Sequence, residues 1–185
     1  STFRHSGGGV TLSGGDPLMQ PDFAGELLKA CKAQGWNTAI ETEGCAETET
    51  YLRLVPYIDT ILMDIKHMDP EKHRLFTGVS NELILNNARR VSAFAPLTIR
   101  VPVIPKFNES EEEIRAIAEF AASLGKVRYV HLLPYYSLGE NKYRMMGIEY
   151  KMNRLSAKSL SNKELEKYRP IVEQAGVSCR IGDES

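Results

Sequence analysis

The stretch GGGVTLSGGDPLMQ, residues 7–20, contains the pattern on which the fold prediction rests. A short apolar run at Val10–Ser13 leads into paired glycines at Gly14 and Gly15, and Asp16 and Pro17 follow before the first expected helix, which starts at Pro21. A strand followed by a glycine turn and a helix is typical of one βα unit. Because glycine has no Cβ, the backbone of such a turn can approach a ligand closely. An ordinary strand-to-helix turn has the same pattern, so the pattern alone leaves both interpretations open.

The same alternation of apolar runs and helix signals continues along the whole chain. The starts of successive runs are separated by 23 to 49 residues. Parallel strands need crossovers of this size, and right-handed crossovers wind them into an open α/β sheet or a barrel. The spacing does not choose between these two architectures. The expected strands are Val10–Ser13, Asn37–Glu41, Thr60–Asp64, Leu97–Val103, Arg128–Leu133 and Val177–Ile181.

Helices are expected between these strands. Phe23, Leu27 and Cys31 are spaced four apart and should form the buried face of the first helix. Pro170 should kink the last helix. Pro134–Leu160 has little periodicity and is expected to be a long loop, which in a compact domain is usually functional or mobile. The expected helices cover Pro21–Gln34, Thr48–Val55, Asn81–Ala95, the segment from Ser110 to Gly125 and the segment from Ser161 to Gly176.

Composition limits the class of protein. The chain has 185 residues, 42% of them hydrophobic, and a formal net charge of −1, which suits one globular domain over residues 1–185 and gives no basic field for nucleic acid. It contains no apolar run of the roughly 18 to 20 residues that cross a bilayer and no signal peptide, so we expect a soluble, cytoplasmic protein without membrane contact. Cys31, Cys45 and Cys179 are isolated and form no CxxC-type metal motif.

Charged residues follow the apolar runs at the points where the parallel strands should end, and α/β folds bind ligands at these ends. Asp64 and Lys66 are two residues apart, so in an extended segment they project to one face. Arg100 alternates with apolar neighbours and should point away from the helices. Glu41 and Thr42 end the second strand. The charges predict either a ligand site with both signs of charge or structural ion pairs and solvated strand ends.

Five stretches, in this order, resemble landmarks of the radical S-adenosylmethionine (SAM) activases of glycyl radical enzymes. The resemblance implies an α/β fold, a partial (β/α) barrel of parallel strands of the radical SAM type. It also implies reductive cleavage of SAM by a [4Fe–4S] cluster, with the 5′-deoxyadenosyl radical abstracting hydrogen from a glycine of a partner such as pyruvate formate-lyase. Flavodoxin or ferredoxin would donate the electron. The stretches are GGGVTLSGGDPLMQ (7–20), IETEG (40–44), LMDIKHM (62–68), TIRVPVIP (98–105) and HLLPYYSLGENKY (131–143).

The resemblance also implies how the first turn binds the cofactor. Ser13, Gly14, Gly15 and Asp16 match the turn that receives the methionyl amino group of SAM, largely through backbone atoms. The common form of the family has glutamate in place of Asp16, a mild departure because the backbone does much of the binding.

Later strands would complete this site. Lys66 and Arg100 match residues near the cofactor carboxylate, and Asp64 matches one near the ribose or a monovalent cation. Glu41 and Thr42 match Asp and Thr at that cation site, where the longer glutamate changes the geometry. Tyr136 stands where the best-known member has a histidine that contacts the cofactor, and a tyrosine can donate a hydrogen bond without carrying positive charge.

The family holds its cluster with a CxxxCxxC motif, which this sequence lacks. We therefore expect a chain truncated at its N-terminus, with no cluster and no catalytic residue of its own, whereas the intact protein would have both cluster and activity. Two alternatives remain. One is a (β/α)-barrel lyase or aldolase with Lys66 as a Schiff-base nucleophile, although the nearby Asp64 would favour the charged amine. The other is a degenerate, non-catalytic protein-binding domain.

Overall fold

The computed structural model describes residues 8–135 and 160–184, which form a six-stranded parallel sheet with its strands in chain order. All six predicted strands are present, with ends that differ from the prediction by at most two residues. The expected loop lies almost wholly outside the described residues. The strands are β1 (Gly9–Leu12), β2 (Asn37–Thr42), β3 (Thr60–Asp64), β4 (Leu97–Val103), β5 (Val127–Pro134) and β6 (Cys179–Ile181).

The helices lie in the crossovers between the strands, and one of them was not predicted. Helix α4 begins after Asp69, whose carboxylate accepts hydrogen bonds from the N–H groups of Glu71 and Lys72, and ends at Gly78 with φ of 91°. These are ordinary start and stop signals, so the sequence contained the information. The longer helices are α2 (Pro21–Ala33), α3 (Thr48–Leu54), α4 (Pro70–Thr77), α5 (Glu82–Val91) and α6 (Glu111–Ala122), with short 3-10 turns η1 (Pro17–Met19) and η2 (Val55–Tyr57).

The last helical segment is interrupted, as Pro170 predicts. It consists of α8 (Asn162–Leu165), the 3-10 turn η4 (Glu166–Tyr168) and α9 (Arg169–Gln174), with the proline in the first turn of α9. A proline is tolerated there because the first N–H groups of a helix have no partner within it.

The predicted buried face of α2 was wrong by one residue. Phe23 is 69% exposed, and the buried residues are Ala24, Leu28 and Cys31. The cause is the helical period: seven residues complete nearly two turns, whereas eight overshoot by about 80°. Ala24 and Cys31, which are seven residues apart, therefore lie on the same face of the helix. Phe23 and Cys31, which are eight residues apart, do not.

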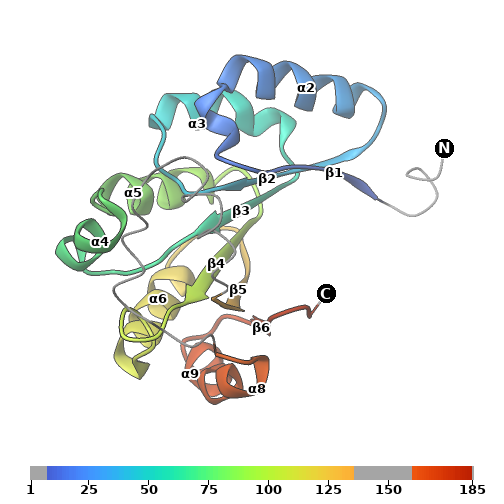
Figure 1. The fold of residues 1–185 in the computed structure, drawn as a ribbon. Helices are drawn as coiled ribbons and strands as arrows, with labels where there is room; N and C mark the ends of the chain where they lie inside the picture. The colour runs from blue at the N-terminus through green and yellow to red at the C-terminus, as the bar shows by residue number, and fades with distance from the viewer. Residues whose placement is uncertain (1–7, 136–159, 185) are drawn as a thin grey trace, which may run out of the picture.

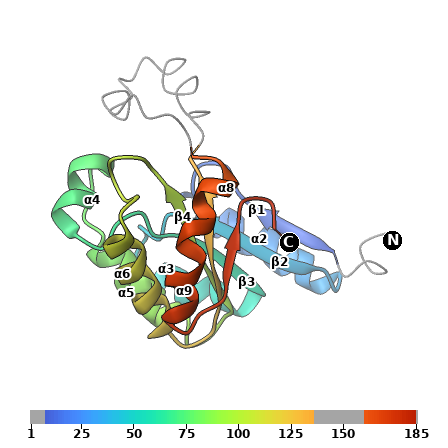
Figure 2. The same ribbon diagram turned by 90° about the horizontal axis from the view of Figure 1, so that it is seen from below.

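The sequential strand order decides between the two architectures. A doubly wound sheet reverses its strand order at one point, which sends helices to both faces. Here the order is β1 to β6 without reversal, so right-handed crossovers place the helices on one face, as a partial barrel requires. Figure 1 shows the helices ranged along one side of the sheet, and Figure 2 shows α9 beside α6 on that outer side.

The core lies between the sheet and these helices. Leu97, Ile99, Val101 and Val103 of β4 are all fully buried, as their alternation predicts, and Arg100 points to the opposite, inner face. The inner face is thus free for polar side chains. Other large core residues are Leu28, Ile40, Tyr51, Leu54, Ile61, Met63, Ile114, Ile117 and Tyr168.

None of the helices in the described ranges is long and apolar enough to cross a bilayer.

Candidate cofactor site

Charged side chains from three strands meet on the inner face at the carboxyl ends of β2, β3 and β4. Asp64 and Arg100 are register partners, so their side chains stand next to each other. Glu41 pairs with Leu62 in the register, one row closer to the amino ends of the strands. Lys66 follows Asp64 by two residues and shares its face. The side chains of Asp64, Lys66 and Arg100 are 19%, 20% and 22% exposed, which makes this a recessed polar cluster.

Arg100 connects two carboxylates of this cluster. Its Nη1 lies 2.9 Å from Glu41 Oε1, and its Nε lies 3.5 Å from Asp64 Oδ1. The Nε atom is buried and makes no hydrogen bond with any residue in the described ranges. A buried guanidinium N–H without a hydrogen bond is costly, and the Asp64 oxygen at 3.5 Å lies at the outer limit for accepting one.

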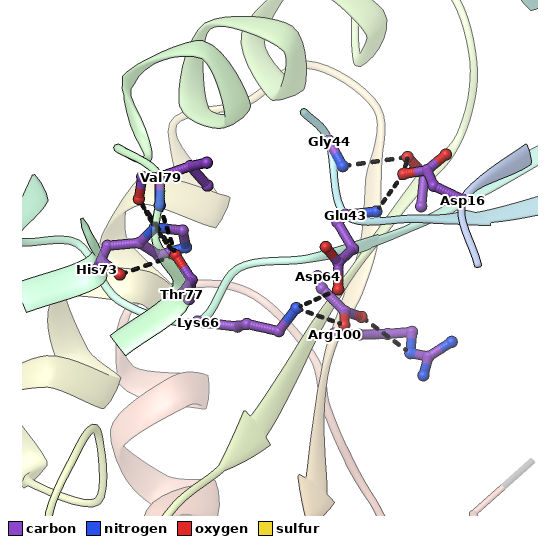
Figure 3. A network of polar contacts seen from close by, with 10 residues as sticks. Asp16, Glu43, Gly44, Asp64, Lys66, His73, Thr77, Val79 and Arg100 are labelled. Atoms are coloured by element: carbon purple, nitrogen blue, oxygen red, sulfur yellow. Dashed lines mark hydrogen bonds and ion pairs between the residues drawn. The ribbon is translucent and has the colours of Figure 1, made fainter. Parts of the chain in front are cut away.

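Lys66 lies between two other carboxylates. Its Nζ is 2.9 Å from Glu43 Oε1 and 3.5 Å from Asp64 Oδ2 (Figure 3). Burial alone would lower the pKa of Lys66, but the charges of Asp64 and Glu43 outweigh burial and raise it. Lys66 is therefore a persistent cation.

The three carboxylates differ in their surroundings. Burial raises the pKa of Asp64, although Lys66 and Arg100 oppose this effect. The charge of Lys66 lowers the pKa of Glu43 against the effect of burial. Burial would raise the pKa of Glu41, but the hydrogen bond from Ser13 and the charge of Arg100 produce a net lowering.

The paired-glycine turn has a conformation that requires glycine. Gly14 has φ of 81° and Gly15 has φ of 48°, in the left-handed region that disfavours residues with a side chain. A Cβ placed on either glycine would meet no atom within 4 Å. Packing thus does not exclude a side chain here, and the turn presents bare backbone to open space.

The carboxylate of Asp16 attaches this turn to the end of β2. Its Oδ2 accepts hydrogen bonds from Thr42 Oγ1 at 2.8 Å and from the Glu43 N–H at 2.9 Å, and its Oδ1 accepts one from the Leu18 N–H at 2.9 Å. The hydroxyl of Thr42 also lies 2.5 Å from the hydroxyl of the fully buried Tyr51. The position of the glycine turn relative to β2 is therefore fixed by side-chain contacts.

The contacts form a closed circuit around the site. Ser13 Oγ donates to Glu41 Oε2 at 2.6 Å, which completes the circuit on the other side of the glycine turn. The structure thus brings together the predicted Ser13, Asp16, Glu41, Asp64, Lys66 and Arg100, with Gly14 and Gly15 between the two ends of the circuit.

The prediction missed Glu43 as the partner of Lys66. Glu43 follows β2 on the same face as Glu41, and this two-residue spacing was the available signal. Thr42 is close in sequence, but its hydroxyl points to Asp16 and Tyr51 and away from Glu41 and Asp64. Tyr136 lies outside the described residues.

The described residues hold no metal-binding cluster. No group of three or more His, Cys, Asp or Glu side chains in the described ranges could bind a metal ion. Cys31 and Cys179 are buried, whereas Cys45 is exposed. Burial raises the pKa of the Cys179 thiol to about 12.

Residues 2–133, which include β1 to β4 and most of β5, match a known family, the Radical SAM superfamily. The chain belongs to the radical SAM superfamily. A radical SAM domain implies SAM and a [4Fe–4S] cluster in the protein that contains it. The fold and family expectations from the sequence are both confirmed.

Relatives within this superfamily are activating enzymes. The chain is 40% identical over 176 residues to the indoleacetate decarboxylase activating enzyme of Tractidigestivibacter scatoligenes, covering 94% of this chain and 55% of the relative. It is 38% identical over 184 residues to the (2S)-3-sulfopropanediol dehydratase activating enzyme of Klebsiella oxytoca, covering 97% and 58%. The chain therefore spans little more than half the length of these curated relatives.

A solved structure matches along nearly its whole length. It is a domain of the pyruvate-formate lyase-activating enzyme from Bacteroides vulgatus, 34% identical, with a TM-score of 0.77. The match covers 95% of this chain and 99% of that domain. The partial barrel described above is thus an arrangement that a radical SAM relative also has.

Proposed function

We propose that residues 1–185 form a single radical SAM core domain that binds SAM on the inner face of the sheet, as part of an activating enzyme for a glycyl radical enzyme. The observation that carries the proposal is the closed circuit of contacts from Ser13 to Asp16. It surrounds a turn of exposed backbone and supplies two cations and the four carboxylates of Asp16, Glu41, Glu43 and Asp64.

The charges of this cluster complement those of SAM. With every group ionised, Asp16, Glu41, Glu43 and Asp64 outweigh Lys66 and Arg100 by two negative charges. SAM carries one carboxylate together with an ammonium and a sulfonium, so it has one net positive charge. A mixed cluster with a slight negative excess favours such a ligand.

Each end of the ligand has suitable partners. The bare backbone of Gly14 and Gly15 suits the methionyl amino group, because nothing fills the space over the turn. Lys66 and the unbonded Nε of Arg100 suit the carboxylate. Asp64 would accept from a ribose hydroxyl. When bound and reductively cleaved, SAM supplies the radical that abstracts hydrogen from a glycine of the partner.

The [4Fe–4S] cluster does not fit the residues described here, because among them no group of side chains could bind it. We propose that the whole protein supplies the cluster ligands from outside these 185 residues. The glycyl radical enzyme as partner, an electron donor such as flavodoxin or ferredoxin, and a cytoplasmic location belong to the same proposal. Pyruvate formate-lyase is one candidate partner.

A monovalent cation at Glu41, Thr42 and Asp64 would compete with contacts that these residues already make. Arg100 already contacts both Glu41 and Asp64, and the hydroxyl of Thr42 is committed to Asp16 and Tyr51. Addition of potassium should raise the affinity for SAM if the cation binds at Glu41, Thr42 and Asp64. An unchanged affinity removes the cation from the proposal.

Two measurements test the proposal as a whole. Calorimetric titration of SAM should give saturable binding to the 185-residue chain, and the reduced whole protein should form 5′-deoxyadenosine in the presence of SAM. Binding without 5′-deoxyadenosine formation would favour the non-catalytic protein-binding domain. Absence of binding in both proteins would overturn the proposal.

A further inference from the structure

Three fully or almost fully buried asparagines hold the loops that follow the strands at the candidate site. Asn81 is 2% exposed, and Asn87 and Asn108 are 0% exposed. The side-chain Nδ2 of Asn81 and of Asn87 donates to two backbone carbonyls of one loop, and that of Asn108 donates to one loop carbonyl and one carbonyl of β4. Loop carbonyls have no ladder partner, so a buried amide that satisfies two of them fixes the loop at little desolvation cost.

Asn108 differs from the other two because it connects two strands. Its Nδ2 donates to the carbonyl of Lys66 at 2.7 Å and to the carbonyl of Pro102 at 2.9 Å. Its Oδ1 accepts from the Ile104 N–H at 2.6 Å. One side chain therefore fixes the residue after β3 that carries the ammonium of the site, together with the end of β4.

This connection lies just beyond the point where a proline ends the ladder between β3 and β4. The N–H of Ile65 donates to the carbonyl of Arg100 at 2.9 Å, which is the outermost hydrogen bond recorded between β3 and β4. In a parallel ladder the next hydrogen bond would come from the N–H of residue 102, and Pro102 has none. The Asn108 amide holds the two strands together at the point where the ladder stops.

The turn that carries Asn108 is itself held in a strained conformation. Lys106 has φ of 64°, the only positive value outside glycine among the residues described. Such a conformation persists where the surroundings enforce it, and it occurs often next to functional sites. Here Glu109 Oε1 accepts from the Lys106 N–H at 3.1 Å, and Asn108 closes the turn onto Ile104.

We propose that Asn108 is a positioning residue that fixes Lys66 against the end of β4 and thereby sets the affinity for the carboxylate of SAM. The proposal rests on the proposed function, because it assigns Lys66 to that carboxylate. Asn108 itself touches no ligand in this scheme. Without its two donated hydrogen bonds, the segment after β3 would lose a side-chain connection to β4, and the Lys66 ammonium would become less well placed.

The test compares Asn108→Asp with Asn87→Asp in the 185-residue chain. Both changes keep the shape of a fully buried side chain and remove two donated hydrogen bonds, but Asn87 holds the loop after β2, at Gly44 and Ala46. The dissociation constant for SAM should be five- to tenfold higher in Asn108→Asp than in Asn87→Asp. The affinity for 5′-methylthioadenosine, which has no amino-acid carboxylate, should change less than twofold in either variant. Equal losses in both variants, or an equal loss for both ligands, would overturn the proposal.

A second measurement separates this proposal from the proposed function. Asn108→Asp should raise the hydrogen-exchange rate of the Ile65 amide at least tenfold, because that amide makes the last ladder bond, and Asn87→Asp should not. If the wild-type chain does not bind SAM but Ile65 responds in this way, the proposed function fails and the strand connection holds. If the wild-type chain binds SAM and neither affinity nor exchange responds, the positioning role fails. Should Asn108→Asp not fold, Asn108→Ala provides the same comparison without an added charge, against Asn87→Ala.

Discussion

Nη1 of Arg100 lies 2.9 Å from Oε1 of Glu41, although strand β3 separates the strands that carry the two residues. The contact is feasible because both side chains rise from the inner face, where Leu62 of β3 lies between Glu41 and Thr98 in the register. Arg100 also contacts Asp64, so one guanidinium connects three neighbouring strands. A site assembled in this way depends on the curvature of the whole sheet.

Replacement of Arg100 by Ala should weaken SAM binding more than tenfold. The change would remove the proposed charge-assisted contact to the cofactor carboxylate, and a tenfold loss corresponds to about 1.4 kcal/mol. Lys66→Ala should have a similar effect. Lys32→Ala is the matched control, because it removes a lysine that pairs with Asp59 at 2.7 Å outside the site. Calorimetric affinities of Arg100→Ala and Lys66→Ala equal to that of the wild type would contradict the assigned roles.

Replacement of Gly15 by Ala should affect both stability and binding. The left-handed φ of 48° should cost about 1 to 2 kcal/mol in the free energy of unfolding. The new methyl group would also enter the space over the turn, so SAM affinity should decrease. Gly35→Ala is the control, because Gly35 also has a positive φ, 72°, and equally free surroundings, but lies after α2. Both variants should lose stability in denaturant titrations, and only Gly15→Ala should lose affinity.

The ion pair between Glu43 and Lys66 should make stability depend on pH in the acid range. The charge of Lys66 lowers the pKa of Glu43 in the folded state, so the carboxylate contributes stability above its unfolded pKa. This contribution is lost as pH falls from the ordinary value of 4.5 through the lower pKa of the folded state. Glu43→Gln should therefore show a flatter dependence of melting temperature on pH over this range. The exposed Glu49→Gln should follow the wild type, and identical curves for all three proteins would exclude the effect.

Lys66 should form no covalent adduct with a carbonyl compound in the presence of borohydride. A Schiff-base lysine needs a lowered pKa, whereas the carboxylates of Asp64 and Glu43 raise the pKa of Lys66 despite its burial. Mass spectrometry after borohydride treatment with pyruvate should find Lys66 unmodified at neutral pH. A stoichiometric adduct on this residue would instead support the lyase alternative.

Local sequence patterns were sufficient for the strands and for much of the helix assignment. The alternation of Leu97, Ile99, Val101 and Val103 gave the buried face of β4 correctly, because a strand has a period of two and needs no knowledge of its neighbours. The buried face of α2 was misassigned by one residue, because a spacing of four approximates the helical period only over short distances.

By itself, the sequence determined that the fold is a series of βα units with charged residues at the strand ends, because strand and helix periods and the glycine turn are local properties. Only the tertiary structure decided which polar groups meet. Glu43 pairs with Lys66, Arg100 pairs with Glu41, and Asn108 donates hydrogen bonds to the backbone of Lys66 and Pro102. Such partners are 6 to 59 residues apart along the chain. Their meeting depends on the register and curvature of the sheet, which result from packing and not from local spacing.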